Sequence, residues 1–129
     1  MPKRKYEVIV RTNPEDYPKE HEMSAAFILA YHFKSDVLFL RPERKKTPDI
    51  DVRGVKWEIK SPKGGGKKTI ENNLRLARKQ SSRIVIDLRR GKLHQTRAIA
   101  RVRFYLATEA HHIKQLKIIT KMRKVIDIL

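Results

Sequence analysis

Apolar and charged residues alternate from Pro48 to Lys60, in the order Pro-Asp-Ile-Asp-Val-Arg-Gly-Val-Lys-Trp-Glu-Ile-Lys. Alternation with period two is typical of strands that have one buried face, and a break in the middle indicates a hairpin. We place the two-residue turn at Arg53-Gly54, because glycine readily adopts the positive φ that such turns need. In this register Asp49 lies opposite Glu58, with every apolar side chain on one face and every charged one on the other.

The apolar pattern of the remaining chain predicts a second set of elements. These are a short strand at 6–12, a helix at 19–33, a strand at 36–40, a helix at 70–80, a strand at 83–88, a helix at 94–108, and two closing strands at 117–120 and 125–129. Thr69 is the expected N-cap of the second helix. A strand, a helix and a strand in succession form a βαβ unit, so the strand at 83–88 should run parallel to the strand of Glu58. The order predicts an α/β (α+β) fold, a mixed central sheet flanked by helices on both sides, in one domain spanning residues 1–129.

The charge of the chain indicates the kind of partner that it binds. The chain has 31 Lys and Arg against 14 Asp and Glu, a formal net charge of +17 and a pI near 10.5. Such a balance favours a polyanion, and nucleic acid before membrane. The acids are concentrated up to Lys63, with 14 basic and 10 acidic residues, whereas the remainder has 17 basic and 4 acidic. A passive basic binder has no need of that segregation.

Other classes are excluded by what the chain lacks. It has no cysteine, and therefore no disulfide framework, thiolate zinc site or cysteine nucleophile. No apolar run is long enough to cross a membrane, and the N-terminus lacks the apolar segment of a secretory signal. We therefore expect a cytoplasmic protein with no membrane partner.

The charged face of the hairpin carries the candidate chemistry. Asp49 and Glu58 directly opposite each other repel, and a bound divalent cation such as Mg²⁺ or Mn²⁺ would offset that repulsion. Lys60 lies one step along the same face, within reach of a phosphate at such a site. The competing interpretation is an ordinary solvated strand face, with Asp51 and Lys56 as a plain cross-strand ion pair.

A glycine-rich segment follows the hairpin. Ser61-Pro62 ends the strand, and Gly64-Gly65-Gly66 is flanked by Lys63, Lys67 and Lys68. The segment either contacts phosphate through its backbone N–H groups and lysines or is a solvated connection, and the Gly-Lys-Ser/Thr ending of a Walker loop is absent. Trp57 is expected in the core, and the sequence offers little exposed aromatic surface for stacking single strands.

These residues carry a family resemblance. Glu22 on a helix, Pro48-Asp49, Glu58-Ile59-Lys60 and a following helix and strand resemble the PD-(D/E)xK nuclease superfamily with its restriction-endonuclease-like core. The chain is more closely similar to the C-terminal tRNA-nuclease toxin domain of CdiA contact-dependent growth-inhibition effectors. The similar stretches begin at Glu22, Pro48, Trp57 and Gln80, and together they cover roughly residues 19 to 90.

The resemblance implies a metal-dependent endonuclease that acts on RNA, with tRNA favoured, and a toxin that has an inhibitor or immunity protein. It implies that Asp49, Glu58 and Glu22 bind the metal and that Lys60 orients the attacking water or stabilises the phosphate. Ser61, Lys63, Lys67, Lys68 and Gln80 are the accessory or substrate-contacting residues that we expect. Toxins of this kind are the tail of very large proteins and are delivered into another cell, whereas this sequence begins at Met1 as a short chain.

Several alternatives remain beside this hypothesis. The first is a DNA endonuclease of the same superfamily. The second is a non-catalytic basic nucleic-acid-binding protein on the same fold, or an interaction module, because a fold does not fix a function. The third is a metal-free ribonuclease that uses His111 or His112.

Overall fold

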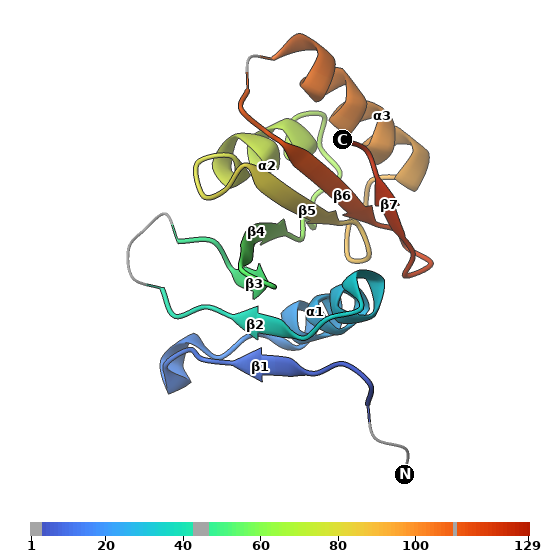
Figure 1. Ribbon diagram of the computed structural model, residues 1–129. Coiled ribbons are helices and arrows are strands. Elements are labelled where there is room, and N and C mark those ends of the chain that lie inside the picture. The colour runs from blue at the N-terminus through green and yellow to red at the C-terminus, as the bar shows by residue number, and fades with distance from the viewer. Residues whose placement is uncertain (1–3, 43–46, 110) are drawn as a thin grey trace.

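The computed structural model describes residues 4–42, 47–109 and 111–129, and it contains a seven-stranded sheet whose strands follow their sequence order. The strands are β1 (Val8–Val10), β2 (Val37–Phe39), β3 (Ile50–Val52), β4 (Val55–Lys60), β5 (Arg83–Asp87), β6 (Gln115–Ile119) and β7 (Val125–Asp127). The helices are η1 (Pro14–Asp16), α1 (Glu20–Phe33), α2 (Thr69–Ala77) and α3 (Gln95–Thr108). The pairs β1–β2, β4–β5 and β5–β6 are parallel and the other pairs are antiparallel, so the sheet is mixed (Figure 1).

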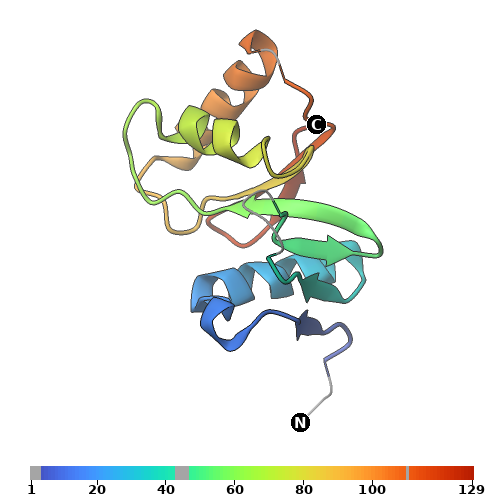
Figure 2. The same cartoon turned by 90° about the vertical axis from the view of Figure 1, so that its left-hand side faces the viewer.

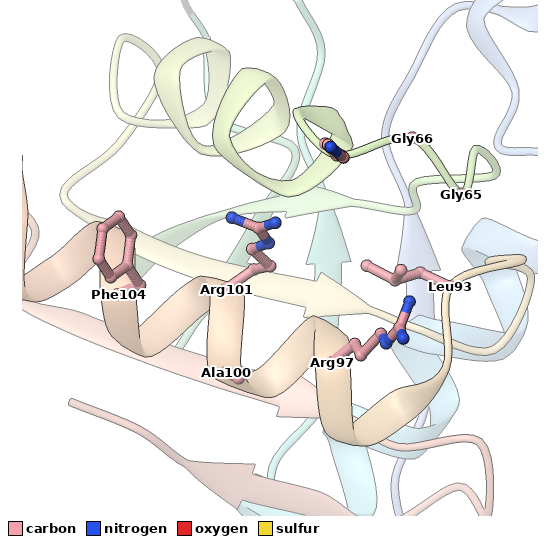
Figure 3. A pocket seen from close by; sticks show the side chains of 8 residues that line it. Gly65, Gly66, Leu93, Arg97, Ala100, Arg101 and Phe104 are labelled. Atoms are coloured by element: carbon pink, nitrogen blue, oxygen red, sulfur yellow. The ribbon is translucent and has the colours of Figure 1, made fainter.

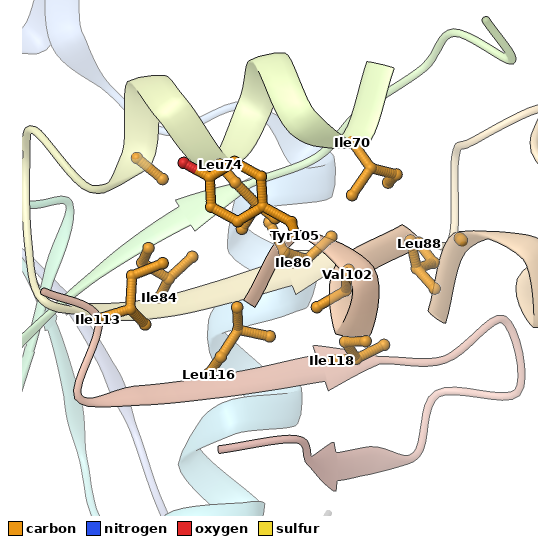
Figure 4. Packing of buried hydrophobic residues seen from close by; sticks show 12 residues of the cluster. Ile70, Leu74, Ile84, Ile86, Leu88, Val102, Tyr105, Ile113, Leu116 and Ile118 are labelled. Carbon is orange, nitrogen blue, oxygen red and sulfur yellow. The ribbon is translucent and has the colours of Figure 1, made fainter. Parts of the chain in front are cut away.

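Helices cover both faces of this sheet, as the sequence predicts. Alternate residues of β5 show the division, because Ile84 and Ile86 pack with α2 and α3 whereas Val85 packs with α1. Figure 2 shows α1 on one side of the sheet and α2 and α3 on the other. Figure 4 shows the core beneath α2 and α3, where Leu74 and Tyr105 meet the isoleucines of β5 and β6. Each face of the sheet therefore buries its own apolar cluster.

The hairpin has the predicted register. Ile50 pairs with Trp57, and the turn residues Arg53 and Gly54 have φ of 50° and 83°. The Gly54 N–H donates to Asp51 Oδ1 over 2.8 Å, which fixes the turn from its own strand. Trp57 is 2% exposed, which confirms it as a core residue.

The element boundaries differ from the prediction in several places. Thr69 is the first residue of α2 and not its N-cap, because its N–H already donates to Gly66 O in the preceding turn and Lys68 occupies the cap position. The helix ends at Ala77, so Gln80 lies in the turn that follows it. Residues 43–46 of the predicted basic loop lie outside the described residues. Within the described part of the chain, every helix is too short or too polar to cross a membrane.

Candidate active site

A pocket of about 230 Å³ opens at the carboxyl end of β4, between the two helix layers. Its lining consists of His21, Glu22, Phe39, Asp49, Ile59, Lys60, Ser61, Asn73 and Arg90. Helix α1 contributes two of these residues, α2 contributes Asn73, and Arg90 follows β5. Binding sites in sheets with parallel strands commonly lie at the carboxyl ends of those strands, where side chains of several elements converge.

Asp49 and Glu58 are brought together across the hairpin. Asp49 Oδ2 accepts a 2.9 Å hydrogen bond from the N–H of Ile59, the residue next to Glu58, and the charge of the Asp49 carboxylate acts on Glu58. Glu58 is only 3% exposed, whereas Asp49 lines the pocket. An ordinary solvated strand face is therefore the wrong description at Glu58.

The electrostatics of the pair favour one shared proton. Burial and the neighbouring Asp49 carboxylate raise the pKa of Glu58 to about 8. Burial also raises the pKa of Asp49, an effect that the hydrogen bond from Ile59 opposes. Lys60 opposes part of the rise in the pKa of Glu58, because its Nζ lies 3.3 Å from Glu58 Oε2. Two interacting buried carboxyl groups do not both ionise near neutral pH unless a further cation binds beside them.

Glu22 lines the same pocket from α1, but its carboxylate has a second role. Its Oε1 accepts a 2.9 Å hydrogen bond from the N–H of Lys19 and closes a capping box at the start of the helix. Among the described residues, no group of three acidic or histidine side chains is gathered closely enough to hold a metal ion. The expected cluster of three acids is thus a pair, Asp49 and Glu58, with Glu22 beside it in the pocket lining.

The carboxyl pair fits a divalent cation. With both groups ionised, Glu58 Oε1 is buried without a hydrogen-bond donor among the described residues. A buried carboxylate oxygen without a partner is costly, and a cation would satisfy it. Magnesium is usually held by one or two carboxylates together with water and substrate oxygens, so Asp49 and Glu58 suffice as protein ligands.

Arg90 is a site residue that the sequence did not single out. Its guanidinium donates to Ser61 O over 3.2 Å and contacts His21 Nδ1 over 3.2 Å, while its Nε is buried without a partner among the described residues. Burial and the adjacent Arg90 charge lower the pKa of His21. Arg90 therefore brings a positive charge to the pocket. Its only sequence signal was a basic turn after a buried strand.

The neighbouring Arg89 explains how this turn is fixed. Asp87 is fully buried, and its carboxylate pairs with the Arg89 guanidinium over 2.8 Å. The same guanidinium donates to Ser24 Oγ and His21 O of α1. The Asp87–Arg89 pair therefore ties the end of β5 to α1 and so holds Arg90 in position.

The predicted accessory residues separate into three groups. Ser61 lines the site and accepts from Arg90 through its carbonyl. Lys67 lines a different pocket, described below, while Lys63, Lys68 and Gln80 line neither of the two.

The structure places His111 and His112, the residues of the metal-free ribonuclease alternative, away from the candidate site. His111 Nδ1 accepts from the N–H of Ile113, and its Nε2 lies 3.1 Å from Leu106 O. Both ring nitrogens are thus engaged in holding the segment after α3. His111 and His112 lie together with Arg78 and Lys79, and the candidate site has neither histidine in its lining.

Comparisons with known proteins give a family. A solved structure, "CdiA-CT/CdiI toxin and immunity complex from Burkholderia pseudomallei", contains a chain with a TM-score of 0.69 and 18% identity, covering 95% of this chain and 98% of that one. At this identity the likeness shows the fold alone. A comparison with curated protein sequences gives no match. The model of the contact-dependent growth inhibition CdiA C-terminal domain matches residues 45–125, more than half of the sequence. The chain belongs to the family of contact-dependent growth inhibition CdiA C-terminal domains.

Proposed function

We propose that the protein is a metal-dependent endonuclease that hydrolyses phosphodiester bonds, with RNA, and tRNA in particular, as the favoured substrate. The observation that carries the proposal is the buried Asp49–Glu58 pair with Lys60 beside it, of which Asp49 and Lys60 line the pocket, in a chain of net charge +17. Membership of the CdiA family supports the RNA and toxin parts. The broad positive charge suits binding to a folded RNA through its backbone and shape.

The chain's own groups have distinct roles in this proposal. Asp49 and Glu58 would hold Mg²⁺ or Mn²⁺, which when bound stabilises the charge that develops on the phosphate. Lys60 lines the pocket with its ammonium beside Glu58, so it orients the attacking water or neutralises a phosphate oxygen. Arg90, on a different element, lines the pocket and would bring its guanidinium charge to the phosphate.

The test is incubation of the protein with plasmid, single-stranded DNA and total tRNA, each in magnesium, manganese or EDTA. We expect metal-dependent cleavage of tRNA and none in EDTA. Cleavage of plasmid with tRNA left whole would overturn the substrate, and undiminished cleavage in EDTA would overturn the metal.

Two variants separate catalysis from charge. Lys60→Met should abolish cleavage while the protein stays folded and still binds RNA. Lys56→Met is the matched control, because Lys56 lies on the same strand and face, is exposed and carries the same charge. If both variants cleave like the wild type, Lys60 has no catalytic role. A non-catalytic nucleic-acid-binding protein on this fold would bind RNA with salt-sensitive affinity and cleave nothing.

The partner and the place of action are part of the same proposal. The structural relative is a complex of a toxin with an immunity protein, which supports a cognate inhibitor for this chain as well. The proposed toxin would act in the cytoplasm of a target cell, where its RNA substrate lies.

A further inference from the structure

A second pocket, of about 430 Å³, lies between the glycine segment and the outer surface of α3. Its lining consists of Gly65, Gly66, Lys67, Leu93, Arg97, Ala100, Arg101 and Phe104. Figure 3 shows the side chains of Arg101 and Phe104 rising from α3 toward α2, with Gly65 and Gly66 at the other end of the view from Phe104. The volume is that of a small-molecule site, so it suits one unpaired nucleotide better than a duplex.

The α3 side of the pocket combines cations with an aromatic ring. Arg97, Arg101 and Phe104 recur at helical spacing and therefore share one face, with the small Ala100 between them. Phe104 is 60% exposed, so its ring is accessible to a ligand in this pocket. Base stacking on an aromatic side chain beside cationic groups is how single-stranded nucleic acid is commonly bound.

The charges around this pocket are available for a ligand. The guanidinium of Arg97 has no hydrogen bond or ion pair within the described chain. Arg101 makes one long contact, 3.9 Å from its Nη1 to Glu71 Oε1, and its side chain is 45% exposed. With Lys67 this gives three positive charges against the one carboxylate of Glu71. An anion with a flat apolar portion matches that combination.

The glycine segment is held against the same elements that form the candidate active site. The N–H of Lys92 donates to Lys63 O over 3.1 Å, and an added Cβ at Gly65 would approach Lys92 Cβ to 3.3 Å. Ser61 lines the first pocket and Gly65 the second, and four residues span at most about 14 Å. A strand of a few nucleotides can therefore reach both pockets.

We propose that this pocket binds an unpaired nucleotide of the nucleic-acid substrate, with its base stacked on Phe104 and its phosphate held by Arg97, Arg101 and Lys67. The inference rests on the proposed nuclease function and deepens it, since the pocket would set where a single-stranded segment lies relative to Asp49 and Lys60. It also corrects the expectation of little aromatic surface for stacking. Phe104 is exposed, as Tyr17 and Tyr31 are, and the periodicity of α3 alone did not reveal it.

The test measures binding of a fluorescein-labelled RNA of about eight nucleotides by anisotropy in EDTA, so that cleavage does not enter. Phe104→Ala should weaken binding roughly 5- to 100-fold without changing the salt dependence. Arg97→Ala should weaken binding and lower the slope of log K against log salt by about 0.7. Arg103→Ala is the charge-matched control, because Arg103 is exposed on the same helix but outside this pocket's lining, and it should bind like the wild type.

Phe104→Trp gives a readout that charge alone does not move. It should keep wild-type affinity, and RNA should quench the new fluorescence, whereas the buried Trp57 of the wild type is shielded from quenching. Circular dichroism checks that each variant is folded. Unchanged RNA affinity in Phe104→Ala, or equal losses in Arg97→Ala and Arg103→Ala, would overturn the proposal and leave the pocket to a protein partner.

The outcomes keep this proposal distinct from the proposed function. If Phe104→Ala loses RNA binding and the wild type cleaves nothing with manganese, the nucleotide-binding pocket is supported and the nuclease function is refuted. If the wild type cleaves tRNA in a metal-dependent way and Phe104→Ala binds RNA like the wild type, the nuclease function is supported and the nucleotide-binding pocket is refuted.

Discussion

Removing the titratable group of Glu58 should flatten the dependence of stability on pH. Its folded pKa of about 8 lies above its ordinary value of 4.5, so the folded state binds the proton more tightly than the unfolded chain. The contribution of Glu58 to the free energy of unfolding is therefore highest at low pH and falls as pH rises from 4.5 through about 8. At 1.36 kcal/mol per pKa unit the full loss approaches about 5 kcal/mol, of which about 3 kcal/mol is already present at pH 7.

Glu58→Gln keeps the shape of the side chain and removes the titration, so in metal-free buffer it should be more stable than the wild type at pH 9 by several kcal/mol. At pH 4.5 the two proteins should be nearly equal. The raised pKa of Asp49 leaves a smaller slope of the same sign in the variant. His21 and His32, whose pKa burial lowers, contribute the opposite slope at acidic pH to both proteins. The difference between the two profiles is therefore the quantity to measure.

The assay is urea unfolding at several pH values in EDTA, followed by the fluorescence of the single, buried Trp57. Glu20→Gln, an exposed acid in the first turn of α1, serves as the control and should follow the wild-type profile. Parallel profiles for the wild type and Glu58→Gln between pH 5 and 9 would refute the buried carboxyl pair.

Three further outcomes follow from the structure. Manganese at 100 times its Kd should stabilise the wild type at pH 8 by about 2.7 kcal/mol, and Asp49→Asn should lose most of this shift in thermal melting, whereas an equal shift would exclude Asp49 as a ligand. Gly54→Ala should lower the free energy of urea unfolding by about 1 kcal/mol, because φ is 83° and an added Cβ meets nothing within 4 Å, so only backbone strain acts. Arg89→Met should cost about 3–5 kcal/mol, since it leaves the Asp87 carboxylate buried and unpaired, and a loss below 1 kcal/mol would show that the pair is unimportant.

The sequence by itself determined the elements and the hairpin. Period-two alternation with a glycine at one turn position favours the register that places the apolar side chains on one face, so the proximity of Asp49 and Glu58 followed from local geometry. The βαβ order likewise required β5 to run parallel to β4. The mixed sheet with helices on both faces, which the order of strands and helices predicted, is also confirmed.

Only the tertiary structure decided what surrounds that pair. The burial of Glu58 depends on how the helices close over the sheet, and no local pattern encodes it. Arg90 is 32 residues from Glu58 in the sequence and joins the pocket because Arg89 ties the end of β5 to α1. Phe104 and the glycine segment line one pocket because α3 packs beside α2. Side chains brought together by sheet order and helix packing carry no shared period along the chain, which is why the second pocket became visible only in three dimensions.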